Sequence, residues 1–128
     1  MIEVTEAPLS PERLVERAKS EGSGCVVTYV GLIRNQSQGK AVFSVEYKDP
    51  DGSATSTLQE IADEAKRRWP VENVAISHRI GKLKVGEINL VVAVASAHRS
   101  EGFAACQYII DNFKARLPTL KIETYQDG

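Results

Sequence analysis

Residues 87–125 read EINLVVAVASAHRSEGFAACQYIIDNFKARLPTLKIETY, and this stretch decides the fold. Residues 87–96 form a nearly continuous apolar run, which predicts a buried strand. Ser100 can cap a following helix that runs to about residue 116 and is ended by Pro118. Alternating residues then predict a last strand over 120–125. Five apolar residues at helical spacing are expected to face the core: Phe103, Cys106, Ile110, Phe113 and Leu117.

The same signals continue toward the N-terminus. Ser10 followed by Pro11 predicts the capped start of a short helix. Residues 34–40 are expected to form a loop and residues 81–86 a basic turn. The other expected elements are strands over 2–5, 25–33, 41–47 and 73–80 and helices over 11–19 and 54–68. Three residues of the strand over 41–47 are expected to share one side: Phe43, Val45 and Tyr47.

This order of elements, β-α-β-β-α-β-β-α-β, predicts an α+β fold. We expect a mostly antiparallel or mixed sheet with about three helices covering one of its faces. The 128 residues are 42% hydrophobic and 26% charged, which is the composition of a globular protein. The chain shows no internal repeat or linker, so residues 1–128 are expected to form a single domain.

Composition also excludes several classes of protein. The formal net charge of −1 argues against a protein that wraps nucleic acid with a global basic field. Two cysteines, Cys25 and Cys106, are too few for a disulfide scaffold or a structural zinc site, and both are expected to be packed and unreactive. The sequence has no apolar run of eighteen residues and no basic, apolar signal at its start, so a cytoplasmic location is expected.

Two basic segments interrupt this near-neutral balance and could form an anion site. Arg34 follows directly after a buried strand, on the rim of the expected sheet. His98 and Arg99 lie between a strand and a helix, where free backbone N–H groups favour phosphate or carboxylate. The alternative for Arg34 is that it is an exposed arginine of a loop. The alternative for His98 and Arg99 is a polar turn in which His98 bonds a backbone carbonyl.

Lys114 and Lys121 lie on either side of the turn at Pro118, so the turn can bring both ammonium groups to one place. Lysines in such a pair can serve as general acid, general base or nucleophile. The alternatives are that Lys114 complements the helix dipole and that Lys121 is an ordinary lysine of a sheet edge. No P-loop, GxGxxG, HExxH or GxSxG motif is present.

Taken in order, these motifs resemble the family of molybdopterin synthase large subunits. The matching stretches include GCVVTYVGLIRN at 24–35, VVAVASAHRSEGF at 91–103 and an F-K-x-R-x-P-x-x-K pattern at 113–121. The resemblance implies an α/β-hammerhead fold and a homodimer. It also implies that a small ubiquitin-like subunit docks at each end to give a heterotetramer, and that its C-terminal Gly-Gly thiocarboxylate carries the sulfur. The terminal Asp127-Gly128 does not match that Gly-Gly end.

The resemblance further implies the reaction and its residues. Sulfur would be transferred to cyclic pyranopterin monophosphate to make molybdopterin, and the large subunit would need no cofactor or metal. The two active-site lysines of the family fall on Lys114 and Lys121, and its substrate-binding residues fall on Arg34, His98 and Arg99. Two other interpretations stay open: a non-catalytic anion-binding or protein-docking module on the same fold, and a small RNA-binding domain, which the few aromatic residues disfavour.

Overall fold

The computed structural model describes residues 1–126, so the interpretation of Asp127-Gly128 concerns residues outside the described part. Three helices and eight strands follow one another as β1 (Ile2–Thr5), α1 (Pro11–Ala18), β2 (Cys25–Leu32), β3 (Gln36–Ser37), β4 (Lys40–Lys48), α2 (Ala54–Arg68), β5 (Val71–Arg79), β6 (Gly81–Lys84), β7 (Ile88–Ser96), α3 (Arg99–Ala115) and β8 (Leu120–Tyr125). The prediction of an α+β fold with three helices and mixed sheets is confirmed.

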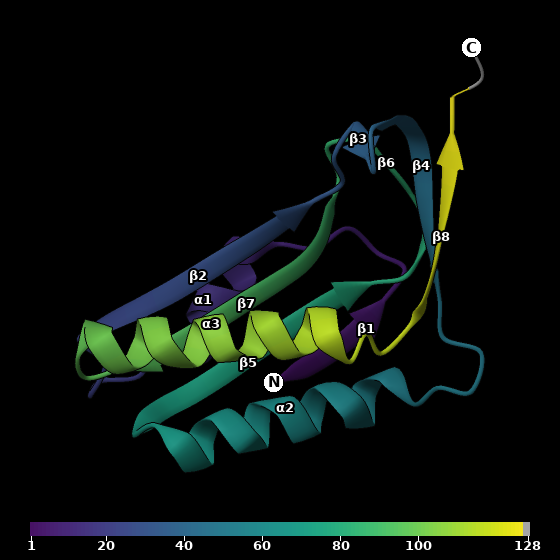
Figure 1. Ribbon diagram of the computed structural model, residues 1–128. Coiled ribbons are helices and arrows are strands. Elements are labelled where there is room, and N and C mark those ends of the chain that lie inside the picture. The colour runs from purple at the N-terminus through teal and green to yellow at the C-terminus, as the bar shows by residue number, and fades with distance from the viewer. Residues whose placement is uncertain (127–128) are drawn as a thin grey trace.

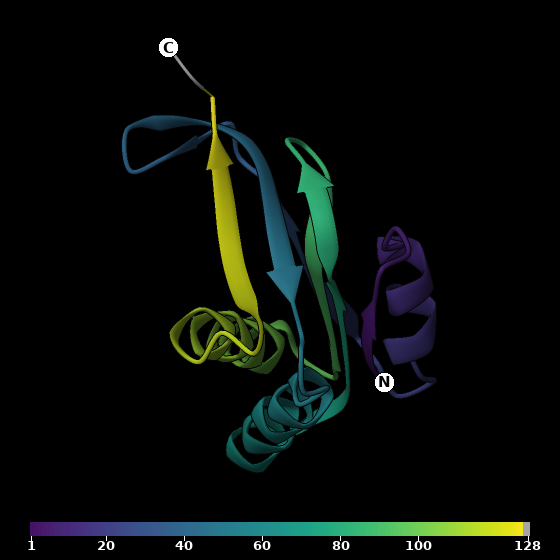
Figure 2. The ribbon, with the colours of Figure 1, turned by 90° about the vertical axis from the view of Figure 1, so that its right-hand side faces the viewer.

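The first sheet has the strand order β1-β5-β7-β2, in which β1 is parallel to β5 and the other pairs are antiparallel (Figure 1). Helices α2 and α3 cover one face, and α1 covers the opposite face (Figure 2). The expectation that the helices cover one face is therefore wrong. The reason lies in β7, where Val92 and Val94 pack under α2 and α3 while Val91 and Ala93 pack under α1.

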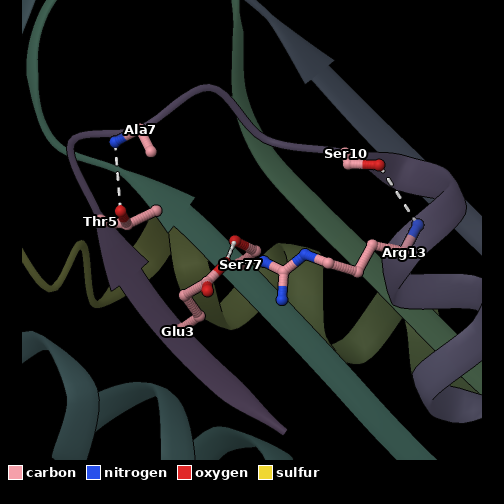
Figure 3. Close-up of polar contacts among 6 residues, drawn as sticks. All are labelled: Glu3, Thr5, Ala7, Ser10, Arg13 and Ser77. Carbon is pink, nitrogen blue, oxygen red and sulfur yellow. Dashed lines mark hydrogen bonds and ion pairs between the residues drawn. The ribbon is translucent and has the colours of Figure 1, made fainter.

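Helix α1 is held to this sheet by a small polar cluster (Figure 3). Ser10 is the N-cap, as predicted, and its hydroxyl accepts a hydrogen bond from the Arg13 backbone N–H at 3.3 Å. The Arg13 guanidinium pairs with the carboxylate of Glu3 on β1. That carboxylate also accepts a hydrogen bond from the buried Ser77 hydroxyl at 2.8 Å, so three elements meet at one acid.

The second sheet projects away from the helices and contains β6, β4 and β8, with β3 paired to the start of β4 (Figure 2). The predicted loop over 34–40 thus contains β3, which turns back through Gln38 and Gly39, both with positive φ, as a two-residue hairpin requires. The predicted basic turn over 81–86 contains β6. Both strands are short and polar, so the hydrophobic pattern could not indicate them.

Two other details differ from the expectation. A bulge between Val42 and Ser44 leaves Phe43 60% exposed, while Val45 and Tyr47 are buried, so these three residues do not share one side. Helix α3 begins at Arg99 with His98 as N-cap, so Ser100 is not the cap.

The buried face of α3 is also rotated from the expected one, because Phe103 is 60% exposed and Gly102 is buried. A Cβ at Gly102 would lie 2.8 Å from Ser96 Oγ and 3.0 Å from Val27 Cγ2. The missing side chain therefore lets α3 approach β2 and β7 closely on the Gly102 side. Among residues 1–126, no helix is both long enough and apolar enough to cross a membrane.

Candidate functional site

A cavity of about 640 Å³ lies where the end of β2, the second sheet and the last turn of α3 meet. This volume is in the range of pockets that hold small-molecule ligands. Three of the five predicted site residues line it: Arg34, Lys114 and Lys121. Its remaining lining includes the apolar or aromatic side chains of Leu32, Val45, Tyr47 and Phe113 and the polar side chains of Gln36, Ser37, Asn89 and Glu123.

The local structure explains how the three cations meet. Arg34 lies two residues after the end of β2, Lys114 lies in the last turn of α3, and Lys121 is the second residue of β8. The turn at 116–119 reverses the chain, and β8 pairs with β4 so that Lys121 lies opposite Tyr47. Residues far apart in sequence thus converge on one cavity.

The charge in this cavity favours an anionic ligand. The ion pairs formed within residues 1–126 include none of Arg34, Lys114 and Lys121, so no direct ion pair neutralises these positive charges. One carboxylate, that of Glu123, also lines the cavity, and it accepts hydrogen bonds from the hydroxyls of Ser37 at 3.1 Å and Tyr125 at 3.0 Å. Three cations against one acid make a compact positive site.

The other two predicted residues lie elsewhere. His98 and Arg99 are exposed at the N-terminal end of α3, and Lys114 is at its C-terminal end. At a rise of 1.5 Å per residue, the helix separates the two ends by roughly 24 Å. The backbone carbonyl of His98 accepts a hydrogen bond from the Ser96 hydroxyl at 2.6 Å, which fixes the turn before the helix. Within one chain, His98 and Arg99 do not reach the cavity.

A buried polar network lies directly behind the cavity wall and was missed in the sequence. His78 on β5 is fully buried, with Nδ1 2.9 Å from the Asn89 carbonyl oxygen and Nε2 3.0 Å from the Thr119 hydroxyl. Burial lowers the pKa of His78, so the ring is neutral at pH 7. The sequence signal for this network is Asn89, a polar residue between two apolar ones near the start of β7.

The same asparagine links this network to the cavity. Asn89 Nδ2 donates a hydrogen bond to the Tyr47 hydroxyl at 3.1 Å, and both side chains line the cavity. Burial raises the pKa of Tyr47, which keeps the hydroxyl protonated at neutral pH. The sequence pattern places Tyr47 on one side of its strand and gives it no role in the site, because strand alternation does not report hydrogen bonding.

Neither cysteine lies in the cavity. Cys106 is buried under α3, and burial raises the pKa of its thiol to about 11. Cys25 is half-buried at the start of β2, with Sγ 3.5 Å from Ser96 Oγ. Within residues 1–126, no three His, Cys, Asp or Glu side chains come together as metal ligands.

Comparisons with known proteins identify relatives of this chain. The family model described as MoaE protein matches residues 4–116. A molybdopterin synthase catalytic subunit from Nostoc sp. is 44% identical over 126 residues, which cover 98% of this chain and 76% of the relative.

Solved structures give the same result. Molybdopterin synthase from Staphylococcus aureus superposes with a TM-score of 0.91 at 32% identity, covering 98% of this chain and 92% of that chain. A complex of subunits 1 and 2 of molybdopterin-converting factor from Helicobacter pylori matches with a TM-score of 0.77 at 15% identity, covering 99% of this chain and 86% of that chain. The second likeness concerns the fold alone.

Proposed function

Because this chain belongs to the MoaE protein family, the catalytic subunits of molybdopterin synthase, we propose that its cationic cavity is the site where sulfur is transferred to cyclic pyranopterin monophosphate. The observation that carries this assignment is the meeting of Arg34, Lys114 and Lys121 in one cavity without a neutralising ion pair. The substrate bears a phosphate and the sulfur donor ends in a thiocarboxylate, so both reactants are anions that such a cavity attracts.

Each cation has a chemical task in this proposal. Arg34 holds the phosphate through paired N–H groups. Lys121 assists opening of the cyclic phosphate and transfers a proton. Lys114 lies beside the thiocarboxylate and polarises its carbonyl. In each transfer, sulfur becomes bonded to a substrate carbon as a carbon–oxygen bond of that carbon breaks, and the oxygen leaves on the opened phosphate or as water. Water then hydrolyses the donor's carbon–sulfur bond, and its oxygen stays on the donor as part of the new carboxylate.

The partner of this subunit is a small sulfur-carrier protein. The thiocarboxylate must enter the cavity from outside, since Cys106 is buried and neither cysteine lines the cavity. The Helicobacter pylori protein of the same fold was solved as a complex of two subunits, which agrees with such a partner. The proposal also includes the cytoplasmic location and the single domain over residues 1–128, which cell fractionation and limited proteolysis test.

His98 and Arg99 belong to this proposal only through a second copy of the chain. Both are exposed about one helix length from the cavity, so they cannot reach their own substrate. In a two-fold symmetric dimer, the same surface of one protomer faces the other, and a residue can complete its neighbour's site. We place His98 and Arg99 of each chain in the cavity of the second copy of the chain, where they bind the anionic substrate.

Reconstitution tests the site. The purified chain is mixed with a thiocarboxylated small subunit and the cyclic precursor, and molybdopterin is measured. We expect product from the wild type, at least a hundredfold less from Lys121→Ala and Lys114→Ala, and wild-type product from Lys82→Ala, an exposed lysine of β6 outside this cavity. Equal product from Lys121→Ala contradicts the site. A wild type that binds the small subunit but makes no product favours the docking-module interpretation instead.

Mixing two inactive variants tests the shared site. In a mixed dimer of Lys121→Ala with Arg99→Ala, one cavity carries both changes and the other carries none, so random mixing restores about a quarter of the sites. If Arg99 served its own chain, every cavity would be defective and activity would stay lost. Sedimentation at micromolar concentration checks the dimer itself, and a single species of about the 14.0 kDa chain mass contradicts it.

A further inference from the structure

Three of the residues that His78 contacts are close neighbours of one of the two lysines in sequence or across the strand pair. The ring of Phe113 lies edge-on to the imidazole with centroids 5.0 Å apart, and Phe113 directly precedes Lys114. The hydroxyl of Thr119 is 3.0 Å from His78 Nε2, and Thr119 lies two residues before Lys121. One buried side chain on β5 therefore contacts the segments that carry both lysines.

The third contact is Tyr47, which lies on the strand paired with the one that carries Lys121. Tyr47 is the cross-strand partner of Lys121, and its ring is edge-on to His78 with centroids 4.9 Å apart. His78 itself belongs to the first sheet, whereas Tyr47 belongs to the second. The imidazole thus fixes how the second sheet and the end of α3 sit against the first sheet, in the region where the cavity lies.

Hydrogen bonding defines the state of this imidazole. The Asn89 carbonyl can only accept, so His78 Nδ1 carries the proton and donates it. Nε2 is then an acceptor, and the Thr119 hydroxyl donates to it. The side chain at position 78 therefore has to supply one hydrogen-bond donor, one acceptor and a flat ring between the rings of Tyr47 and Phe113.

We propose that His78, acting through Thr119, Phe113 and Tyr47, is a positioning residue that holds Lys114 and Lys121 at the separation needed for sulfur transfer. This inference rests on the proposed function of the cavity. His78 does not line the cavity and touches no substrate, so its effect is on the rate and not on substrate binding. Reacting groups displaced by about 1 Å can lose a hundredfold in rate, so small shifts of a lysine matter.

The turn at 116–119 offers the sharpest test, because Thr119 is buried but lies outside the cavity lining. Thr119→Val keeps the shape of the side chain and removes the donor to His78, whereas Thr119→Ser keeps the donor and removes a methyl group. We expect Thr119→Val to lower kcat about tenfold, with KM for the cyclic precursor and Kd for the small subunit within twofold of wild type. Thr119→Ser is expected to keep at least half of wild-type kcat.

Substitutions of His78 itself provide a second, independent test of the positioning role. His78→Gln retains one donor and one acceptor, and His78→Phe retains the ring but neither hydrogen-bonding group. We expect higher kcat from His78→Gln than from His78→Phe, measured per folded molecule after circular dichroism. In the wild type, 15N chemical shifts are expected to show the Nδ1–H tautomer of His78.

The outcomes of these experiments distinguish the positioning role of His78 from the proposed function of the cavity. If Thr119→Val is folded and has wild-type kcat while Lys121→Ala is inactive, the positioning role is wrong and the proposed function stands. If Thr119→Val changes only thermal stability, the network is merely structural and the inference is again wrong. If Lys121→Ala itself keeps full activity, the proposed site fails, and the positioning role fails with it.

Discussion

Tyr47 and Lys121 lie directly opposite each other in the ladder between β4 and β8, and both line the cavity. Opposed residues of antiparallel strands leave the sheet on the same face, so the two side chains extend from adjacent positions toward the same cavity. The Tyr47 hydroxyl accepts a hydrogen bond from Asn89 Nδ2 at 3.1 Å, which leaves its own proton to be donated. A neutral donor therefore lines the same cavity as the lysine to which the proposal gives proton transfer.

Removing this hydroxyl is expected to slow the reaction more than it weakens the fold. Tyr47→Phe keeps the ring against His78 and should lower kcat/KM for the cyclic precursor about five- to tenfold, the loss expected of one hydrogen bond of about 1 kcal/mol. The matched control is Tyr108→Phe, since the Tyr108 hydroxyl bonds Glu64 away from the cavity. Equal activity of the two variants contradicts a role for Tyr47 in the site.

Glycine at position 24 is expected to be essential for the turn that carries His98. A Cβ on Gly24 would lie 2.1 Å from the Ala97 carbonyl oxygen, which is backbone and cannot move aside cheaply. Gly24→Ala should lower the free energy of unfolding by about 2–4 kcal/mol in urea denaturation. Gly22→Ala is the control, because its Cβ would meet only the flexible end of Glu72 at 3.1 Å. Similar losses for both variants would show that the close approach is not the cause.

Glu64 is expected to make stability depend on acidic pH. Hydrogen bonds from Tyr108 and Arg116 hold the pKa of Glu64 below its ordinary value of 4.5. A lowered folded-state pKa contributes stability above 4.5 that is lost as pH falls through the folded-state value. The difference in urea midpoint between wild type and Glu64→Gln should therefore shrink from pH 6 to pH 3. A difference that stays constant over this range contradicts the assignment.

Cys106 is expected to resist alkylation in the folded protein. Burial raises the pKa of its thiol to about 11, so about one molecule in a thousand carries the reactive thiolate at pH 8. Iodoacetamide followed by mass spectrometry should modify the half-buried Cys25 first, and should modify Cys106 only when guanidinium unfolds the chain. Equal labelling rates of Cys106 in folded and unfolded protein would overturn this expectation.

The sequence predicts the parts of this molecule that depend on local pattern. The apolar run over 87–96 indicates the central strand, and Pro118 between Lys114 and Lys121 indicates the turn that brings the lysines together. The three-helix α+β arrangement follows from the order of such patterns. The apolar run before Arg34 indicates a strand end at this point, and Arg34 does line the cavity. The expectation that this strand is buried is wrong, because β2 is a half-buried strand at the edge of the first sheet.

The sequence pattern cannot predict contacts between residues that are far apart in the chain. The bulge that exposes Phe43 depends on how β4 pairs with β8, and the rotated face of α3 depends on Gly102 meeting Ser96. The hydrogen bond between His78 and Thr119 joins residues 41 positions apart. No spacing rule for helices or strands contains such a pair, so the wall behind the cavity could be found only from the folded chain.

The pairing of β8 with β4 also has a consequence for the order of folding. The strands of the first sheet are complete at Ser96, whereas the contact between Tyr47 and Lys121 closes a loop of more than seventy residues. Pairings within the first sheet span as far, since Ile2 pairs with Ile76, but all four strands of that sheet emerge during synthesis before β8 does. The first sheet can therefore form before the cavity does, and a chain whose β8 has not yet paired with β4 lacks Lys121 in its place opposite Tyr47.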